Sequence, residues 1–235
     1  MARTLIVGDV HGCAAELSEL FNAVALSADD RVVFVGDLVA RGPDPRTVLE
    51  LARSVGARSV RGNHEERLIA ARAARQNGGK GPRLGGSHEK LLALLEPEDW
   101  QFLEALPLGL ELGEHGLRVV HAGVVPGVPW EQQDPWLVTH IRSIADDGTP
   151  SERWGTPWGA LYTGPPHIVF GHNAQKSVQL HPDATGLDTG CVYGGALTAL
   201  LLPEHAGPPP VAERRDALVS VPARAQYADY GRGLP

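Results

Sequence analysis

The sequence predicts an α/β fold in which a central, mainly parallel β-sheet is covered by helices on both faces. Three observations lead to this expectation: short apolar, β-branched runs recur along the chain, helical patterns separate the early runs, and the 235 residues can bury a sizeable core. An apolar run, a helix and a second apolar run in succession form a parallel crossover, which buries its strands. We therefore expect one domain over residues 1–203.

The expected strands are the apolar runs, and the first expected helices lie between them. The runs are TLIVGDV, RVVFVGDL, ARSVRGNH, LRVVHAG, HIVFGHN and LTALLLP. Helical patterns cover residues 14–26, 43–54 and 65–75, and Pro43 stands where a first helical turn tolerates proline. Each of these helices brings the chain back to the edge of the sheet at which the next parallel strand begins.

The regular alternation stops after residue 75. A Gly-rich, basic stretch, QNGGKGPRLGGSHEKL, opens this part of the chain, and short helical patterns cover residues 89–95 and 98–105. We expect residues 76–106 to form a small helical cap over the carboxyl edge of the sheet. A further short helix is expected over residues 136–145, and residues 204–235, rich in Pro and Arg, are expected to form a loosely attached tail.

The composition excludes several classes of protein. Acidic residues outnumber basic ones, 28 to 21, and the formal net charge is -7, so a broad nonspecific nucleic-acid surface is not expected, although a local cationic site is compatible with it. The N-terminal apolar run is too short for a secretory signal and no stretch approaches a membrane span, so we expect a cytoplasmic protein without membrane contact. The two cysteines, Cys13 and Cys191, are too few for a disulfide scaffold and are expected to be buried fillers.

Five of the expected strands end in residues of types that bind metal ions, and in four of the five a Gly comes directly before the first of them. These residues are Asp9 and His11 in GDVHG, Asp37 in GDLVARG, Asn63 and His64 in GNHE, His121 in HAG, and His172 in GHN. The carboxyl ends of parallel strands converge on one crevice, where open α/β sheets bind ligands. A lone His after a strand is more often a core histidine, and GD alone is a turn signal. Five such strand ends in one chain favour a shared metal site.

The donor types indicate which metal chemistry to expect. Carboxylate, imidazole and amide oxygen without thiolate suit manganese, iron or zinc in a hydrolytic site. The ligands exceed the need of one ion, and hydrolytic sites often hold two ions about 3.5–4 Å apart, bridged by a carboxylate. We therefore expect two divalent ions, with Asp37 as the bridge. Manganese is the first expectation, and iron, zinc, cobalt and magnesium are alternatives.

Two further side chains are candidates for phosphate chemistry. Arg41 stands four residues after Asp37, and its planar fork suits a phosphoryl oxygen better than a lysine would. His64 follows Asn63 and is expected to point away from the metal ions, toward a departing group. The alternative for His64 is a packing role at the start of a helix.

With these residues in view, the sequence resembles the phosphoprotein phosphatase superfamily of dinuclear metallophosphoesterases. The motifs GDVHG, GDLVARG, GNHE, HAG and GH occur in the family's order over about residues 5–203. The stretches GDLVARGP and GLDTGCVYGGALTALLLP resemble the ApaH-like branch, which is similar to bacterial symmetrical diadenosine tetraphosphatases. The resemblance implies a calcineurin-like fold, in which central mixed or parallel β-sheets are flanked by helices as an αββα sandwich with a small helical cap.

The resemblance also implies roles for individual residues. One metal ion would be held by Asp9, His11 and Asp37, and the other by Asp37, Asn63, His121 and His172. Phosphate would be bound by Arg41 and by a second arginine, which Arg142 in VTHIRSI matches best. His64 would protonate the leaving group. Protein phosphatases of the superfamily have an Asp where this chain has Ala40, and that Asp orients the catalytic His; the sequence does not identify a substitute.

A polyphosphate substrate carries more charge than one arginine pair can meet. The basic candidates for distal phosphates are Lys80, Arg83, Lys90 and Lys176, and the aromatic candidates for stacking a base are Trp154, Trp158, Tyr162 and Tyr193. Basic residues in a Gly-rich loop are usually only solvated, and tryptophans in RWGTPWGALY can equally pack the core.

The favoured function is hydrolysis of phosphoanhydride bonds in dinucleoside polyphosphates such as diadenosine tetraphosphate, giving two ADP. The equivalent bond at a nucleoside-tetraphosphate-capped RNA 5′ end, an RNA decapping reaction, is compatible with the acidic charge because only the chain end need enter the site. A Ser/Thr protein phosphatase on the same scaffold is the alternative, and Ala40 argues against it. A catalytically silent binding protein would require a damaged ligand set, and a structural metal site would favour thiolates.

Overall fold

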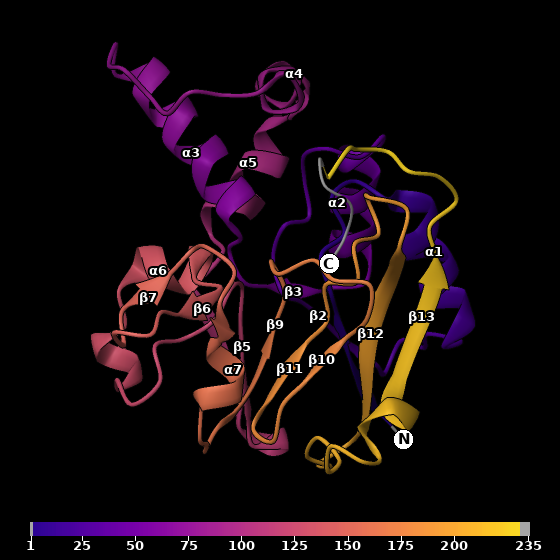
Figure 1. Cartoon of the computed structure of the whole chain (residues 1–235). Coiled ribbons are helices and arrows are strands. Elements are labelled where there is room, and N and C mark those ends of the chain that lie inside the picture. Colours follow the sequence, from indigo (N-terminus) through magenta and orange to yellow (C-terminus); the bar gives the residue numbers. More distant parts are fainter. Residues whose placement is uncertain (1, 231–235) are drawn as a thin grey trace.

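The computed structural model describes residues 2–230 of the chain, and two five-stranded mixed sheets form its centre (Figure 1). The first sheet has the order β13-β12-β1-β2-β3, in which β1, β2 and β3 are parallel and β12 and β13 are antiparallel to their neighbours. Its strands are β1 (Arg3–Val7), β2 (Arg31–Phe34), β3 (Arg58–Ser59), β12 (Ala196–Pro203) and β13 (Leu218–Pro222).

The second sheet has the order β10-β11-β9-β5-β4. Its central strands β11, β9 and β5 are parallel, and β10 and β4 are antiparallel at the two edges. Its strands are β4 (Gly109–Leu112), β5 (Leu117–Val120), β9 (His167–Phe170), β10 (Gln179–Leu180) and β11 (Ala184–Gly186). The sequence therefore predicted β5 and β9 as strands but did not reveal that they belong to a sheet of their own.

The two sheets pack against each other through alternate residues of their strands. Ile6 of β1 lies in an apolar cluster with Val119 and Val169 of the second sheet. Leu5 and Val7 point to the other face of β1 and lie in the cluster that includes the helices α1 and α2. The resulting layers are helix, sheet, sheet, helix, which is the αββα sandwich that the resemblance implied.

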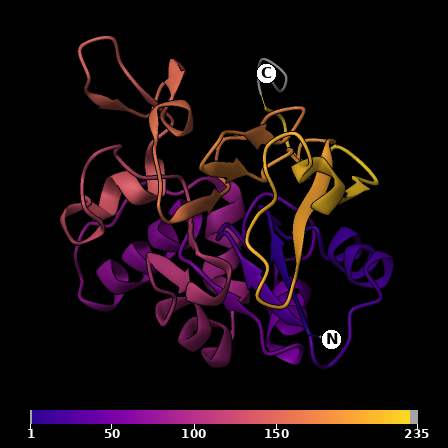
Figure 2. The same ribbon diagram turned by 90° about the horizontal axis from the view of Figure 1, so that it is seen from below.

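Helices cover the outer faces of both sheets. Helices α1 (Ala14–Ala23) and α2 (Pro45–Ser54) lie on the first sheet, and α1 contacts β12 and β13. On the other side, α6 (Pro135–His140), α7 (Trp158–Leu161) and a small sheet of order β7-β6-β8 lie against the second sheet, on the side away from α1 (Figure 2). The small sheet consists of β6 (Ser143–Ile144), β7 (Pro150–Ser151) and β8 (Thr156–Pro157).

Three helices stand together at one end of the sheets, namely α3 (Asn63–Gln76), α4 (Gly86–Leu94) and α5 (Pro97–Glu104) (Figure 1). Helices α4 and α5 fall inside the segment 76–106 that was expected to form a cap. The buried carboxylate of Asp99 in α5 accepts a hydrogen bond of 2.6 Å from Arg53 Nη1 and lies 3.5 Å from Arg46 Nε. Both arginines belong to α2, so this cluster fastens the helical group to the body of the fold.

Two expectations from the sequence are corrected. The helix expected over residues 136–145 ends at His140, because Ser143 and Ile144 pair with β7 and β8 instead. The residues after Pro203 are not a loosely attached tail, because β13 pairs with β12 along its length. The buried guanidinium of Arg214 also donates to several main-chain oxygens of residues 181–184. Residues 231–235 of that segment lie outside the described residues.

The described residues also form short 3-10 helices, namely η1 (Gly113–His115), η2 (Trp130–Gln132) and η3 (Arg214–Ala217).

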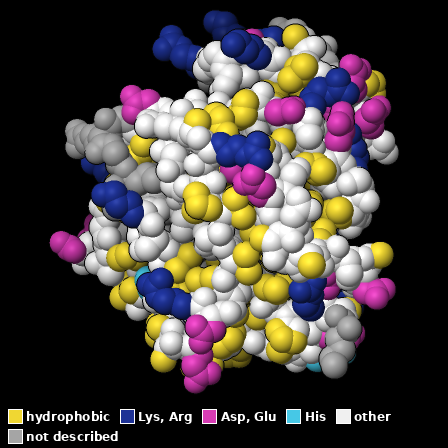
Figure 3. Space-filling model, turned by 90° about the vertical axis from the view of Figure 1, so that its right-hand side faces the viewer, with side chains coloured by type: hydrophobic (Ala, Val, Ile, Leu, Met, Phe, Trp, Pro, Cys, Tyr) yellow, Lys and Arg dark blue, Asp and Glu magenta, His cyan; other side chains and the backbone are white. Residues whose placement is uncertain are grey.

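The two cysteines lie close together in the core. Cys13 and Cys191 are buried free thiols with their Sγ atoms within 4.8 Å of each other, and the neighbouring thiol and burial raise the pKa of Cys191. Over residues 2–230, no helix has the length and apolar character needed to cross a membrane. Figure 3 shows basic and acidic side chains interspersed on the face that carries α1 and β13.

Candidate active site

The residues that follow five strands meet at the end of the sandwich beneath α3. Asp9 and His11 follow β1, Asp37 follows β2, Asn63 begins α3 after β3, His121 follows β5, and His172 follows β9. The first three strands belong to the first sheet and the last two to the second. The group expected at the edge of one sheet is therefore built by both sheets, and all the proposed metal ligands belong to it.

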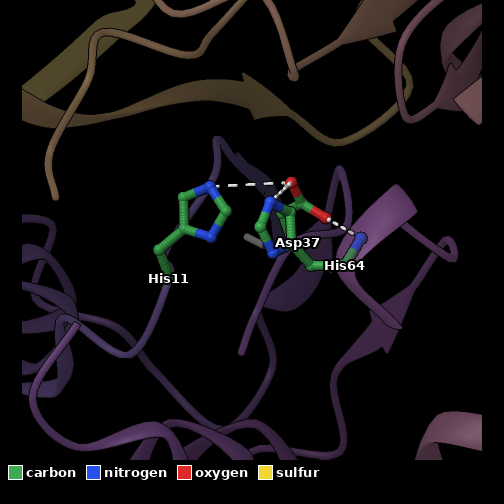
Figure 4. A group of neighbouring side chains, drawn as sticks. All are labelled: His11, Asp37 and His64. Carbon is green, nitrogen blue, oxygen red and sulfur yellow. Dashed lines mark hydrogen bonds and ion pairs between the residues drawn. The ribbon is translucent and has the colours of Figure 1, made fainter. Parts of the chain in front are cut away.

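The carboxylate of Asp37 lies at the centre of this group. Its Oδ2 atom is 3.5 Å from His11 Nε2, 3.4 Å from His121 Nε2 and 4.0 Å from His64 Nε2. Its Oδ1 atom accepts a hydrogen bond of 3.0 Å from the backbone N–H of His64 in the first turn of α3. Figure 4 shows the imidazole rings of His11 and His64 beside the carboxylate of Asp37.

Two groups of potential ligands share Asp37. One group is His11, Asp37 and His64, and the other is Asp37, His121 and His172, with the ligand atoms of each group within 4.8 Å of one another. Asn63 joins the second group, because its Oδ1 atom lies 3.0 Å from His121 Nε2 and 3.1 Å from His172 Nδ1. Asp9 is held beside His172, whose backbone N–H lies 3.1 and 3.0 Å from the two carboxylate oxygens.

Backbone carbonyl groups orient two of the imidazoles. His11 Nδ1 is 3.2 Å from Val39 O, and His121 Nδ1 is 2.8 Å from Val35 O. A carbonyl oxygen only accepts, so both Nδ1 atoms carry a proton and donate it. The Nε2 atoms of both rings then face Asp37, which is the arrangement that directs a histidine toward a metal ion.

The charges in the site favour a cation. Burial and the neighbouring Asp188 raise the pKa of Asp9, and burial raises the pKa of Asp188 itself to about 6. Although burial acts in the opposite direction, Asp37 raises the pKa of His121 to about 10. These raised pKa values mean that the site favours an added positive charge. The charge would lie where an imidazole nitrogen, an amide oxygen and a carboxylate converge. Divalent metal ions fit this donor set, because hard oxygen and imidazole donors suit them and a cation relieves the repulsion among the acids.

Backbone conformation also distinguishes the site. Five of its non-glycine residues have positive φ angles between 48° and 70°, in the left-handed region, and these are His11, Asp37, Ala40, Arg41 and His172. This conformation is unfavourable for residues with a Cβ and is retained mainly where the surroundings or function require it.

Two glycines allow the ligands to approach the backbone. A Cβ atom on Gly62 would lie 2.1 Å from Asp37 Oδ1, and one on Gly171 would lie 1.9 Å from Asp9 Oδ1. Any side chain at either position would therefore displace a carboxylate. This explains why a Gly precedes the ligands in GNHE and GHN.

The buried carboxylate of Glu65 fastens two ligand loops together. It accepts hydrogen bonds from the backbone N–H groups of Asp37 (2.9 Å), Val39 (3.2 Å) and Gly62 (2.9 Å). Burial raises the pKa of Glu65 to about 7. Neither Glu65 nor Asp188 was expected in the site from the sequence, although an acid in the first turn of α3 and the LDTG stretch were the available signals.

A cavity of about 90 Å³ opens between the ligands and the predicted phosphate-binding residues. Its lining includes Arg41, Arg142, His64, Asp188 and Tyr193. The Arg41 guanidinium lies 3.2 Å from His11 Nε2 and 5.4 Å from the Tyr193 ring centre. Arg142 donates to Asn173 Oδ1 (3.1 Å) and lies 5.3 Å from the ring centre of Trp154, which is 48% exposed. Two guanidinium groups thus face the same small space.

The other predicted substrate residues are spread more widely. Lys90 lines a separate cavity of about 320 Å³ that Arg41 also borders, whereas Lys176 lines a cavity along β12 and Lys80 and Arg83 lie exposed in the loop before α4. One aromatic candidate is corrected, because Trp158 is buried and donates its indole N–H to Ala122 O. Tyr162 is half-buried, donates its hydroxyl to Pro166 O and borders a separate cavity of about 300 Å³.

The chain is similar to known proteins along most of its length. The sequence pattern of the Calcineurin-like phosphoesterase family matches residues 2–201. The asymmetrical bis(5′-nucleosyl)-tetraphosphatase PrpE of Halalkalibacterium halodurans is 33% identical over 224 residues, which cover 85% of this chain and 89% of the relative. The symmetrical bis(5′-nucleosyl)-tetraphosphatase of Ralstonia nicotianae is 31% identical over 257 residues, which cover 82% of this chain and 87% of the relative.

Solved structures of related proteins have the same fold as this chain. A crystal structure named as a "putative diadenosine tetraphosphatase" has a TM-score of 0.79 at 34% identity and covers 94% of this chain and 93% of the other. A Saccharomyces cerevisiae Ser/Thr phosphatase structure has a TM-score of 0.57 at 16% identity, covers 95% of this chain and 80% of the other, and shares the fold.

Proposed function

The chain belongs to the calcineurin-like phosphoesterase family and is a hydrolase, and from this premise we propose that it cleaves phosphoanhydride bonds of dinucleoside polyphosphates such as diadenosine tetraphosphate. The observation that carries the proposal is one carboxylate, Asp37, shared by two ligand groups beneath two guanidinium groups. The two bis(5′-nucleosyl)-tetraphosphatases that match more than four fifths of the chain support the substrate class.

The family uses divalent metal ions, and we propose two per chain, with manganese as the first choice. Asp9, His11 and Asp37 would hold one ion, and Asp37, Asn63, His121 and His172 would hold the other. When bound, the ions supply Lewis acidity that activates water and neutralises charge developing on the phosphoryl group.

The remaining chemistry belongs to side chains of the chain. Arg41 and Arg142 bind the non-bridging oxygens of the phosphoryl group and stabilise them as their charge changes. His64 donates a proton from Nε2 to the departing oxygen. Burial lowers the pKa of His64 well below its usual value, and an anionic phosphate beside the ring opposes that shift and favours the acid form.

The volumes of the two cavities support the proposal that the phosphate groups and a nucleoside arm of the substrate bind in different cavities. A cavity of about 90 Å³ is smaller than the roughly 300–1,000 Å³ of small-molecule sites, so it would take phosphate groups alone. The neighbouring cavity of about 320 Å³, bordered by Arg41, Lys90 and Leu94, would take one nucleoside arm. Exposed Trp154, beside Arg142, would stack the base of the other arm. Lys80 and Arg83 remain proposed contacts to distal phosphates, and Tyr193 remains a candidate for stacking a base.

We propose symmetric cleavage to two ADP, because the motifs GDLVARGP and LDTGCVYGG resemble the symmetrical branch. The same chemistry would act on a nucleoside-tetraphosphate-capped RNA 5′ end, and a cytoplasmic location remains a prediction from the sequence. A Ser/Thr protein phosphatase is the alternative, and the 16% identity to the yeast phosphatase supports the shared fold alone.

Product identification tests the proposal. Purified protein is incubated with manganese and diadenosine tetraphosphate, the nucleotides are separated, and a phosphoserine peptide is assayed in parallel. Two ADP for each substrate consumed and a slow peptide reaction are expected. ATP plus AMP would keep the substrate class but change which phosphorus is attacked, whereas a fast peptide reaction with an inert tetraphosphate would favour the protein phosphatase.

A further inference from the structure

The ring of His64 has a partner in the helical group above the site. His64 Nδ1 lies 3.0 Å from Nε2 of His88, which belongs to α4 and is 24 positions further along the chain. Both side chains are buried, with 6% and 5% of their residue surfaces exposed. The ring centres are 4.9 Å apart and the ring planes differ by 13°. The contact therefore joins a short cap helix to a residue that faces the catalytic carboxylate.

The other contacts of His64 leave only one nitrogen free for chemistry. Its backbone N–H is bonded to Asp37 Oδ1, and its ring lies edge-on to His11 with ring centres 4.9 Å apart. Because Nδ1 is bonded to His88, Nε2 is the nitrogen that faces the site, 4.0 Å from Asp37 Oδ2. The hydrogen bond to His88 thus fixes both the rotation of the ring and which nitrogen points at the substrate.

The acid form of His64 also determines what His88 must do. An imidazolium carries protons on both nitrogens, so a partner at Nδ1 has to accept a hydrogen bond. Neutral His88 has one acceptor nitrogen, and that nitrogen is Nε2 if its own proton is on Nδ1. When His64 gives the Nε2 proton to a departing oxygen, it becomes neutral with its remaining proton on Nδ1, and the hydrogen bond to His88 persists.

We propose that His88 is a positioning residue that accepts a hydrogen bond from His64 Nδ1 and so holds Nε2 of His64 ready to protonate the leaving group. The arrangement follows the general logic of a catalytic group oriented by a third residue. Ala40 is buried beside the site and its methyl group offers no such partner. The inference rests on the proposed acid role of His64.

The test uses three variants and two kinds of measurement. His88→Phe keeps a planar ring without an acceptor, and His88→Gln restores an acceptor oxygen on a side chain of similar reach. Leu95→Ala, at the buried end of α4, loosens the same helix while leaving His88 in place. Rates of the manganese-loaded enzyme are measured on aryl phosphates whose leaving groups range from good to poor.

The expected kinetic result is selective. His88→Phe lowers kcat about tenfold for the poorest leaving group and less than about twofold for the best, with little change in KM. His88→Gln recovers part of the loss, and Leu95→Ala shows no dependence on the leaving group. Equal losses across the series in His88→Phe would overturn the proposal. If His64→Ala itself shows no leaving-group dependence, the acid role fails, and the inference about His88 fails with it.

A spectroscopic readout does not depend on turnover. Histidine-ring ¹H–¹⁵N spectra of the metal-free protein report which nitrogen of each ring is protonated. In His88→Phe the Nδ1 signal of His64 should move toward that of an unprotonated nitrogen, while in His88→Gln it should stay near its original position. The ring signals of His115, which is bonded to Ala206 O and Thr4 Oγ1 away from the site, should not move. An unchanged His64 signal in His88→Phe would contradict the proposed hydrogen bond.

Discussion

Asp37 Oδ2 lies 3.4 Å from His121 Nε2, although the two residues follow strands of different sheets. This contact marks the point where the two halves of the sandwich meet. The carboxylate faces His11 from the first sheet as well. A carboxylate in this position can bind two ions at once, and the proposed two-ion site depends on it.

The first prediction concerns Asp37 itself. Asp37→Asn removes a charge that both proposed metal positions share, so metal affinity and hydrolysis should each fall by more than about 100-fold. Metal content after dialysis and the hydrolysis rate would be measured together. Asp146→Asn, at an exposed position in the turn after β6, is the control and should behave as the parent. An Asp37→Asn protein that retains two ions would contradict the assignment of the bridge.

The second prediction concerns the leaving group. Nucleoside diphosphates leave more readily than serine or an unactivated alcohol, so they need less help from an acid. His64→Ala should therefore reduce hydrolysis of a monoester with a poor leaving group by about 100-fold or more, and that of the tetraphosphate by much less. Both rates are measured at saturating substrate, and equal losses on the two substrates would argue against the acid role of His64.

The third prediction concerns the glycine that precedes His172. In Gly171→Ala the new methyl group would lie 1.9 Å from Asp9 Oδ1, so the loop must shift. We expect unfolding free energy to fall by about 1–3 kcal/mol and activity to be largely lost. Urea unfolding measures the first effect. Gly113→Ala meets nothing within 4 Å at an ordinary φ angle and should change neither property.

The fourth prediction concerns the cavity that is proposed to bind one nucleoside arm of the substrate. Lys90 and Arg41 border the same cavity, so Lys90→Ala should raise KM for diadenosine tetraphosphate about fivefold while kcat stays close to that of the parent. KM for a small aryl phosphate should not change, because that substrate would not reach the cavity. Lys176→Ala removes a lysine from a different cavity and serves as the control. An unchanged KM for the tetraphosphate in Lys90→Ala would remove this cavity from the proposal.

The fifth prediction concerns stability at low pH. Hydrogen bonds from the Arg3 side chain and from Ser27 hold the pKa of Asp30 well below its usual value. A carboxyl with a depressed pKa in the folded state contributes stability above its unfolded pKa of about 3.9, and the contribution is lost as the pH falls through the folded value. Asp30→Asn should therefore lower stability at pH 7 and have a smaller effect near pH 2. Urea unfolding at the two pH values checks this, and an equal effect at both would contradict it.

The convergence of the proposed metal ligands could be predicted from the sequence because each lies within a few residues of the end of a strand. A Gly followed by Asp, Asn or His at the end of an apolar run is a local signal, and parallel strands bring such ends together without further information. The sequence also predicted α3, although the helix begins at Asn63 and not at residue 65, and the position of Asp37 follows from the same local pattern. The family resemblance then added Arg142 and the division of ligands between two ions.

The remaining features depend on contacts between distant parts of the chain. β13 pairs with β12 only after a connection in which Arg214 binds main-chain oxygens, and Pro and Arg content gave the opposite expectation. The role of Glu65 requires the backbone N–H groups of another loop. His88 looked like part of a basic loop because its partner, His64, is brought to it only by the docking of α4 on α3.

Anomalous diffraction from crystals grown with manganese would show how many metal ions the site binds and which residues hold them. We expect two peaks per chain, both within bonding distance of Asp37, with His11 as a ligand of one ion and His121 and His172 as ligands of the other. A single ion, or two ions that do not share Asp37, would contradict the two-ion site on which the proposed hydrolysis depends.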